Sequence, residues 1–326
     1  MRAIVRRCYG PPDVLALETI AKPVPKDDQL LVRVHAASVN PADWHLVRGE
    51  PYLMRPDVGF GKPKNPRIGI DFAGTVEAVG KDVTLFQPGD EVFGGGNGSL
   101  ADYIVIKETG NLTRKPANIS FEEAAAVNVG ALTSLQALRD GGLVKAGHKV
   151  LINGSSGGVG TYAVQLAKWL GAEVTAVCST RNVELVRSLG ADRVIDYTQE
   201  DFTQDSARYD VIMDNVAGRP ILEIRRVLKP QGKYLVIGGG GPDAGPWLGA
   251  LKAPIKAFVI SWFVDQELKF FLSHVSAEDL GVIAGLLESG TVRSVIDRRY
   301  PLEQAAEAMR YLETGRARGK VIVTIG

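Results

Sequence analysis

The stretch KVLINGSSGGVGTYAVQLAKWLGAEVTAV, residues 149–177, decides the fold of this chain. It opens on the apolar run 150–152 and enters a turn that carries four glycines between Gly154 and Gly160. Apolar residues at helical spacing follow, and a second apolar run begins after Gly171. This order predicts a strand, a glycine turn, a helix and a strand, which is a βαβ unit. Such a turn brings backbone N–H groups and the helix N-terminus to a pyrophosphate, so the unit is expected to bind a dinucleotide.

The glycine turn departs from the strictest form of this motif. Its spacing is G-x-x-G-x-x-G, because Ser155 stands where the pattern G-x-G-x-x-G has glycine. A glycine-rich turn can also serve only to pack a helix on a sheet, and the motif alone leaves that alternative open. If it binds the cofactor, the contacts are expected from Gly154, Ser156, Gly157, Gly158, Val159 and Gly160.

Length and composition favour a two-domain soluble protein. The chain has 326 residues, of which 45% are hydrophobic and 23% charged. A net charge of +1 gives no electrostatic basis for binding nucleic acid or an anionic membrane. No secretory signal is expected in the charged N-terminus, and no apolar run approaches the ~20 residues of a membrane helix. The presence of only two cysteines, Cys8 and Cys178, favours a cytoplasmic location and excludes a four-cysteine zinc site.

The pattern of apolar and polar residues along the sequence changes near residue 120. Before it, short β-like runs are separated by Gly, Pro, Asn and Asp, which predicts an irregular, mostly-β domain. After Ser120, helical and strand patterns alternate, which predicts a parallel sheet covered by helices on both faces. The apolar run 258–264 is expected to be an extra edge strand, where two subunits could pair. The other strands of this sheet are expected at 149–153, 173–178, 193–196, 209–213 and 233–237.

The end of the second strand indicates which dinucleotide binds. An acidic residue at this position selects NAD by binding the ribose hydroxyls. Here the strand is followed by Ser179, Thr180 and Arg181, with no carboxylate among them. Hydroxyl groups and a guanidinium suit a 2′-phosphate, so NADPH is favoured over NADH. The alternative is that Arg181 is a solvated charge that opens the next helix.

Several blocks along the whole chain resemble the zinc-independent quinone oxidoreductase branch of the medium-chain dehydrogenase/reductase family. The resemblance implies an α/β fold in which a Rossmann doubly wound parallel sheet is inserted into a GroES-like mostly-β domain. Residues 1–120 plus 270–326 would form the GroES-like catalytic domain and residues 121–269 the Rossmann NADP-binding domain, with the active site in a cleft between them. A homodimer is the expected assembly, with a tetramer as the alternative. The blocks are SVNPADWHLVRG (38–49), GIDFAGTVEAVG (69–80), FQPGDEVFG (86–94), ALTSLQAL (131–138), NGSSGGVG (153–160) and LGADRVIDY (189–197).

The positions of the family's zinc ligands hold other residues in this chain. Asn40 stands in place of a cysteine, and Ile70-Asp71 in place of a His-Glu pair. Asn is a poor zinc ligand and Ile is none, so we expect no metal. A lone histidine nearby, His45, is expected to be a surface or packing residue. Without a Lewis acid a simple ketone is hard to polarise, whereas an enone or quinone gives a delocalised anion.

The sequence therefore predicts an NADPH-dependent oxidoreductase that transfers hydride to a quinone or an α,β-unsaturated carbonyl. The resemblance places Asn40, Asp43 and Thr133 near the nicotinamide, Asn40 to orient substrate or ribose and Thr133 to fix the nicotinamide ring. Asp43 could relay a proton or could simply cap the turn that begins at Pro41. Tyr52 could donate a proton or serve in packing. Water is a further possible proton source.

The resemblance implies more cofactor contacts beyond the glycine turn. Lys320 is expected to approach the cofactor, or else to be an exposed lysine at the start of a strand. The segments 51–66 and 238–254, rich in Pro and Gly, are expected to form walls over a ligand or to be disordered. The other contacts are expected from Tyr197 at the adenosine phosphate, from Asn215 and Val216 near the ribose, and from Gly238 and Gly239.

Two other functions stay open at the level of sequence. One is a zinc-free reductase or dehydrogenase for other carbonyls or alcohols. The other is an NADPH-binding sensor or partner protein with little turnover, because a fold does not fix a function. The nature of the acceptor molecule is not determined by any of these residues.

Overall fold

The computed structural model describes residues 1–238, 245–247, 252–262 and 264–326. The chain divides into two compact units. Unit 1 comprises Met1–Leu132 and Val275–Gly326, and unit 2 comprises Thr133–His274. Helix α4 (Asn128–Gln136) begins in unit 1 and ends in unit 2.

Unit 1 is built on a seven-stranded sheet with the order β14-β15-β3-β4-β5-β7, in which β6 also pairs with β3. The last strand of the chain, β15, runs antiparallel to β3, with Val321 opposite Val39. On its other side β3 pairs with β4, with Ser38 opposite Asp71. A separate hairpin consists of β1 (Arg2–Arg6) and β2 (Leu15–Thr19). The strands of the large sheet are β3 (Gln29–Val39), β4 (Asp71–Val79), β5 (Glu91–Gly95), β6 (Tyr103–Lys107), β7 (Leu112–Arg114), β14 (Ile296–Pro301) and β15 (Lys320–Thr324).

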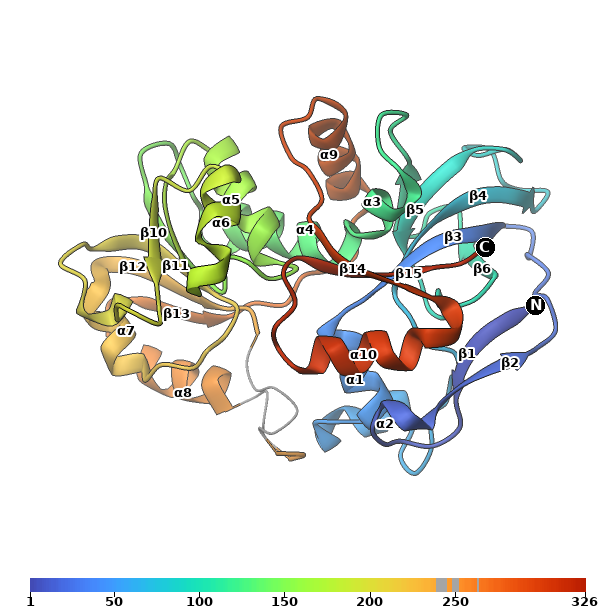
Figure 1. The fold of residues 1–326 in the computed structure, drawn as a ribbon, viewed down its shortest axis with the longest axis horizontal. Helices are drawn as coiled ribbons and strands as arrows, with labels where there is room; N and C mark the ends of the chain where they lie inside the picture. The colour runs from blue at the N-terminus through green and yellow to red at the C-terminus, as the bar shows by residue number, and fades with distance from the viewer. Residues whose placement is uncertain (239–244, 248–251, 263) are drawn as a thin grey trace. The chain divides into compact units, whose positions relative to one another are not determined.

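The helices of unit 1 are short and are ended by local signals. Helix α1 (Pro41–Arg48) has Asn40 as its N-cap and Pro41 at its first turn, and it stops at Gly49, whose φ is 61°. Helix α3 (Phe121–Ala125) starts with the Ser120–Glu123 capping box. Helix α10 packs beside α1 (Figure 1). The remaining helices are α2 (Arg55–Val58), α9 (Ala277–Glu288) and α10 (Ala305–Glu313).

Unit 2 contains a six-stranded parallel sheet with the order β10-β9-β8-β11-β12-β13. The order changes direction at β8, and α5 and α6 lie on one face of the sheet while α7 and α8 lie on the other (Figure 1). The expected doubly wound sheet is therefore confirmed. Its elements are β8 (Lys149–Asn153), α5 (Gly160–Trp169), β9 (Glu173–Cys178), α6 (Val183–Ser188), β10 (Arg193–Asp196), β11 (Tyr209–Asp214), α7 (Ile221–Val227), β12 (Leu228–Val236), α8 (Lys252–Ser261) and β13 (Glu267–Phe270).

The expected edge strand at 258–264 is wrong. Helix α8 covers Lys252–Ser261 and packs against β13, which is the actual edge strand of the sheet. A short apolar run does not distinguish a strand from a helix that buries one face, and here the helical period continues back to Lys252. The edge strand β13 was missed because its sequence, ELKF, is too short and too charged to give a strand signal.

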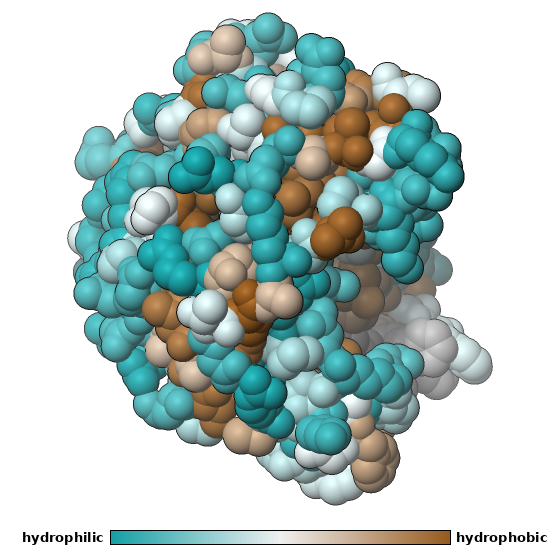
Figure 2. Space-filling model, turned by 90° about the vertical axis from the view of Figure 1, so that its right-hand side faces the viewer, coloured by the Kyte–Doolittle hydropathy of each residue, from teal (hydrophilic) through white to brown (hydrophobic). Residues whose placement is uncertain are grey.

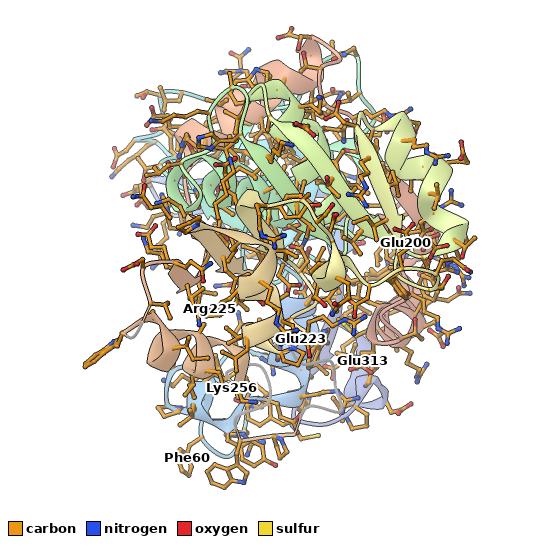
Figure 3. All side chains as sticks on the ribbon, turned by 90° about the vertical axis from the view of Figure 1, so that its left-hand side faces the viewer. Phe60, Glu200, Glu223, Arg225, Lys256 and Glu313 are labelled. Atoms are coloured by element: carbon orange, nitrogen blue, oxygen red, sulfur yellow. The ribbon has the colours of Figure 1, made fainter. Side chains whose placement is uncertain are left out.

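The surface is mixed in character. On the face drawn in Figure 2, hydrophilic residues predominate, and hydrophobic residues lie in separate groups. The segment 51–66 of unit 1 contains η2 (Tyr52–Met54) and α2. Phe60, in the same segment, is 81% exposed to solvent (Figure 3). Among the helices of the described residues, none has the length and apolar composition to span a membrane.

Candidate active site

A buried polar cluster lies in unit 1, where three segments of the sequence meet. Asp71 is the first residue of β4, and the strand register sets Ser38 of β3 opposite it. Asn40 follows β3 directly, and Lys320 begins β15, which pairs with the end of β3. None of these four side chains is more than 3% exposed to solvent. Buried charged and polar groups are costly unless they pair, so their contacts define the cluster.

Asp71 and Lys320 form the centre of this cluster. Asp71 Oδ2 accepts hydrogen bonds from Ser38 Oγ at 2.8 Å, Asn40 Nδ2 at 3.0 Å and Lys320 Nζ at 3.0 Å. Lys320 Nζ also donates to Asn40 Oδ1 at 2.5 Å. These contacts fix the orientation of the Asn40 amide, with its oxygen toward the ammonium and its nitrogen toward the carboxylate. The alternative of an exposed Lys320 is therefore wrong.

Asp43 is attached to the same cluster through Asn40. Its Oδ2 accepts from the backbone N–H of Asn40 at 2.8 Å, so the capping contact considered for Asp43 is present. Its Oδ1 is buried and has no hydrogen-bond partner among the described residues. Burial, together with the charge of Asp71, raises the pKa of Asp43 to about 7. Both protonation states of this carboxyl group are therefore accessible near neutral pH.

Tyr52 lies in a different environment from the cluster residues. It is half-buried in η2, and the guanidinium carbon of Arg55 lies 4.0 Å from the centre of its ring. A stacked cation of this kind matches the packing interpretation of Tyr52. Its role as a proton donor stays a prediction.

The glycine turn of unit 2 is held in one shape by its own backbone. Gly154 has φ 73°, in the left-handed region that favours glycine. A Cβ atom at Gly160 would lie 2.1 Å from the carbonyl oxygen of Gly154, so only glycine fits there. Ser155, which replaces a glycine of the stricter motif, donates from Oγ to the carbonyl oxygen of Val177 at 2.9 Å. This serine therefore ties the turn to the end of β9.

Asn182 connects the glycine turn with the loop that follows β9. Its Nδ2 donates to Ser156 Oγ at 2.9 Å and to Ser179 Oγ at 3.2 Å, while its Oδ1 is buried without a partner in the described part of the chain. Asn182 directly follows Arg181 but was not among the residues predicted for the site. Asn182 therefore links two groups of residues expected to contact the nucleotide, the glycine turn and the segment 179–181.

An acidic group lies beside the end of β9, although none of the residues that directly follow this strand is acidic. Asp196 ends the neighbouring strand β10 and lies opposite Cys178 in the register. Thr180 Oγ1 donates to Asp196 Oδ2 at 2.5 Å, and this bond lowers the pKa of Asp196. This carboxylate was not foreseen, because the prediction of NADPH rested only on the residues that follow β9. Arg181 and Tyr197, which is 56% exposed, are the remaining expected contacts near it.

The other predicted contacts of unit 2 follow β11 and β12. Asn215 Nδ2 donates to the carbonyl oxygen of Asn153 at 2.9 Å, and its Oδ1 has no partner among the described residues. The next residue, Val216, is exposed. A Cβ atom at Gly238 would lie 2.8 Å from the carbonyl oxygen of Asn215, so these two segments approach closely. Gly239 and most of the segment 238–254 lie outside the described residues.

Helix α4 reaches the glycine turn through Ser134. Its Oγ donates to the carbonyl oxygen of Val159 at 2.9 Å. The adjacent Thr133, expected to fix the nicotinamide, has its Oγ1 3.0 Å from Ser273 Oγ. Ser134 and Ser273 were both missed, and no motif in the sequence marks Ser273. Close backbone packing and two unpartnered amide oxygens, on Asn182 and Asn215, fit a bound dinucleotide in unit 2.

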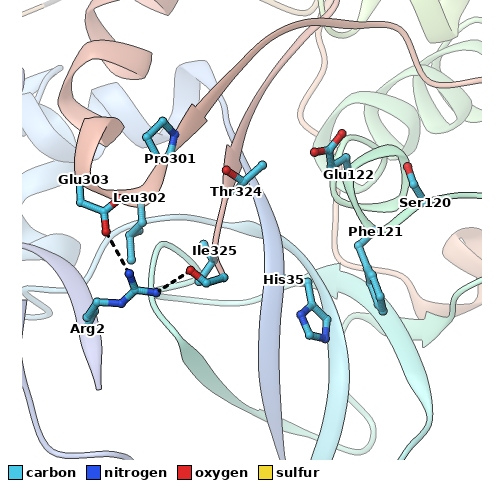
Figure 4. Close-up of a pocket in the computed structure, with 11 residues that line it drawn as sticks. Arg2, His35, Ser120, Phe121, Glu122, Pro301, Leu302, Glu303, Thr324 and Ile325 are labelled. Atoms are coloured by element: carbon cyan, nitrogen blue, oxygen red, sulfur yellow. Dashed lines mark hydrogen bonds and ion pairs between the residues drawn. The ribbon is translucent and has the colours of Figure 1, made fainter.

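A cavity of about 540 Å³ lies elsewhere in unit 1 (Figure 4). Arg2 lines this cavity, and its Nη1 donates a hydrogen bond to Glu303 Oε1 at 2.9 Å. His35 also lines it, and burial lowers the pKa of this histidine. None of the residues predicted for the site lines this cavity. Within the described ranges, no three His, Cys, Asp or Glu side chains are grouped as metal ligands.

Comparison with known proteins agrees with this architecture. Residues 26–117 match the family described as Alcohol dehydrogenase GroES-like domain, and residues 189–323 match the one described as Zinc-binding dehydrogenase. The chain belongs to the medium-chain dehydrogenase/reductase family, in its quinone oxidoreductase-like branch.

Individual relatives cover nearly the whole chain. The chloroplast envelope quinone oxidoreductase homolog of Arabidopsis thaliana is 37% identical, over 99% of this chain and 98% of its own. The chloroplastic NADPH-dependent alkenal/one oxidoreductase of the same plant is 34% identical, over 99% of this chain and 79% of its own. The solved quinone oxidoreductase from Coxiella burnetii superposes with a TM-score of 0.87 at 30% identity, covering 100% of this chain and 99% of that one.

Proposed function

We propose that this protein is an NADPH-dependent oxidoreductase that transfers hydride to a quinone or an α,β-unsaturated carbonyl without zinc. The observation that carries the proposal is the buried pair of Lys320 and Asn40. Within the described residues, two of the three N–H groups of Lys320 are taken by Asn40 and Asp71, which leaves one to donate to a ligand. The names of the similar plant proteins, a quinone oxidoreductase homolog and an NADPH-dependent alkenal/one oxidoreductase, support these two classes of acceptor.

The cofactor would be held mainly by residues of unit 2. The turn Gly154–Gly160 and Ser156 are proposed to receive the pyrophosphate, and Arg181 with Tyr197 the 2′-phosphate. Asn215 and Gly238 are proposed to lie along the ribose, and Thr133 at the nicotinamide. When bound, NADPH supplies a hydride ion to the acceptor.

The residues of unit 1 are proposed to act on the reacting end. Hydride addition to an enone leaves negative charge on the carbonyl oxygen, and a fixed donor in a buried site stabilises such charge strongly. Asn40 and Lys320 are fixed by their contacts with Asp71, so they meet this requirement. Asp43 is proposed to hold a proton for the enolate, since its pKa of about 7 allows it to carry one at neutral pH.

The proposed roles, cofactor binding by one set of residues and action on the acceptor by another, support the domain assignment made from the sequence. We propose that residues 1–120 with 270–326 act as the catalytic domain, because they supply Asn40, Asp43 and Lys320. Residues 121–269 are proposed to act as the cofactor-binding domain, because they supply the glycine turn.

An acceptor panel tests the proposed function. Steady-state rates are measured with NADPH and with NADH against an enone, a quinone, a saturated ketone and an alcohol. The expected result is oxidation of NADPH by the enone or the quinone, at a kcat/KM at least about tenfold above that with NADH. Preferential turnover of the saturated ketone or the alcohol would contradict the proposal. Tight NADPH binding with no turnover would instead favour a sensor.

We further propose that the protein is a homodimer. The outer edge of β13 ends the sheet of unit 2, and unpaired strand edges are common pairing sites. Phe270 and Leu272 are exposed at and just beyond this strand. Light scattering after gel filtration should give about twice the chain mass of 35.0 kDa. A mass of one chain at micromolar concentration would contradict the dimer.

We also propose a cytoplasmic location. Both cysteines, Cys8 and Cys178, are free thiols, which suits a reducing compartment. Several similar proteins carry the word chloroplastic or mitochondrial in their names, so location differs within the family. Fractionation of the native cells with an antibody to this chain should place it with cytoplasmic markers, and recovery with an organelle would contradict this.

A further inference from the structure

We propose that Asp71 is a positioning residue for hydride transfer: one oxygen of its carboxylate fixes Lys320 and Asn40, and the other oxygen is anchored at the start of helix α4. This inference rests on the function proposed above, because Lys320 and Asn40 are the residues assigned to the reacting end. Asp71 itself is fully buried and is not expected to touch the cofactor or the acceptor. It was noted in the sequence only as the residue at a lost zinc-ligand position.

The first oxygen of Asp71 binds the two functional side chains. Its Oδ2 accepts from Lys320 Nζ at 3.0 Å and from Asn40 Nδ2 at 3.0 Å, and Ser38 Oγ donates a third bond at 2.8 Å. Charge-assisted hydrogen bonds of this kind are stronger than neutral ones. In a buried site the ammonium group of Lys320 has no water to replace the carboxylate, so its position follows that of Asp71.

The second oxygen anchors the carboxylate to the scaffold. Its Oδ1 accepts from Asn128 Nδ2 at 2.9 Å and from the backbone N–H of Val129 at 3.2 Å, at the start of helix α4. The amide of Asn128 is itself fixed, because its Oδ1 accepts from Asn111 Nδ2 at 2.6 Å. A Cβ atom at Gly95 would lie 2.3 Å from Asn128 Nδ2, so the neighbouring strand is also packed tightly here. Asp71 therefore cannot turn without breaking contacts on both sides.

The chemistry of the five partners makes this position sensitive to one substitution. All five are hydrogen-bond donors, and a carboxylate only accepts. In Asp71→Asn the side chain keeps its shape, but its NH2 group must face donors in either orientation. It will point either at Lys320 and Asn40 or at Asn128 and Val129. One of the two sets of contacts is then lost.

The test compares Asp71→Asn with a matched control. Asp102→Asn makes the same change at a carboxylate of unit 1 that accepts three hydrogen bonds from Arg2 and none from the cluster. Hydride transfer is measured in a single turnover with NADPH and an enone. We expect Asp71→Asn to lower this rate at least about tenfold, and Asp102→Asn by less than about twofold. The dissociation constant of NADPH should change by less than about threefold in both, because its phosphate contacts are in unit 2.

A double-mutant cycle separates positioning from general damage to the fold. If Asp71 acts through Lys320, Asp71→Asn should cost less than about threefold in rate when Lys320→Met is already present. An unchanged tenfold cost in that background would overturn the proposal, as would a wild-type rate for Asp71→Asn alone. Should Asp71→Asn fail to fold, Ser38→Ala removes only one donor to Oδ2. It should then slow transfer about threefold in the wild type and not in Lys320→Met.

A second measurement does not depend on turnover. Lys320 is 3% exposed, so an amine-reactive reagent should label it slowly, as followed by peptide mass spectrometry. Labelling at this residue should be at least about fivefold faster in Asp71→Asn than in Asp102→Asn. Equal labelling rates in the two variants would overturn the proposal that Asp71 fixes the position of Lys320. A wild-type protein that reduces no quinone or enone would contradict the proposed function, while the labelling result would still decide whether Asp71 positions Lys320.

Discussion

Lys320 Nζ lies 3.0 Å from Asp71 Oδ2 and donates a hydrogen bond to it, although the two residues are 249 positions apart in the sequence. The contact exists because β15, at the end of the chain, pairs with β3, which also pairs with β4. Both side chains are buried, so this is an ion pair shielded from solvent. The catalytic role proposed for Lys320 and the stability of unit 1 therefore depend on the same contact.

Removal of this lysine should affect both properties. Lys320→Met leaves the carboxylate of Asp71 buried without its cation, which costs about 3–5 kcal/mol when a buried pair is broken. We expect a loss of that order in the free energy of unfolding, measured by urea denaturation, and a fall in kcat of at least about tenfold. Lys107→Met is the control, because it breaks an exposed pair with Asp28 and should cost less than about 1 kcal/mol. Equal losses for the two variants would contradict the buried role of Lys320.

Asp43 should make stability depend on pH. Burial and Asp71 raise its pKa in the folded protein to about 7 from 3.8, so the neutral form is favoured by folding. The stabilisation is complete below the unfolded pKa and is lost as pH rises through about 7. The wild type should therefore lose up to about 4 kcal/mol relative to Asp43→Asn between pH 4 and pH 8. Urea denaturation of both proteins across this range measures the difference, and a difference that is independent of pH would show that Asp43 does not titrate there.

Arg181 should determine the choice of nucleotide. Its guanidinium is proposed to bind the 2′-phosphate. The carboxylate of Asp196, on the neighbouring strand, would repel the negative charge of this phosphate. Arg181→Ala should raise the KM for NADPH by at least about tenfold and leave the KM for NADH within about twofold. Arg187→Ala is the control, since this arginine pairs with Glu184 on the exposed side of α6. An unchanged ratio of the two KM values in Arg181→Ala would contradict the cofactor assignment.

The glycine turn should not tolerate a side chain at Gly160. Gly160→Ala forces a Cβ atom to within 2.1 Å of the carbonyl oxygen of Gly154 unless the turn moves. We expect the dissociation constant of NADPH, measured by fluorescence titration, to rise at least about tenfold, which corresponds to about 1.4 kcal/mol. At Gly281, in helix α9, a Cβ atom meets nothing within 4 Å, so Gly281→Ala should leave NADPH binding unchanged. If both variants bind NADPH like the wild type, the turn is not the pyrophosphate site.

The parts of the fold that sequence predicted are those set by local signals. The strand, glycine turn and helix of residues 149–170 follow one another, so periodicity and glycine spacing were sufficient. The prediction of a strand at 258–264 was wrong because an apolar stretch that short is compatible with both a strand and a helix. Asp196 was overlooked because its position beside Thr180 arises from pairing between two strands.

The polar cluster shows why the candidate site was only partly predictable. Resemblance supplied Asn40, Asp43 and Lys320 as separate residues, but nothing local indicates that Asp71 joins them. Their meeting depends on the register of three strands, which a single sequence does not determine. Asn182 and Ser134 were missed for a similar reason, since their partners Ser156 and Val159 lie 26 and 25 positions away.

Direct observation of the transferred hydride tests the central claim most sharply. NADPH carrying deuterium at C4 is incubated with the protein and an enone, and the product is analysed by NMR and mass spectrometry. Stereospecific transfer to the β-carbon predicts that one of the two C4 epimers gives product with one deuterium there, and that the other gives none. If neither of the two epimers gives deuterated product, in a protein that still binds NADPH, the assignment of this chain as an NADPH-dependent reductase of enones is contradicted.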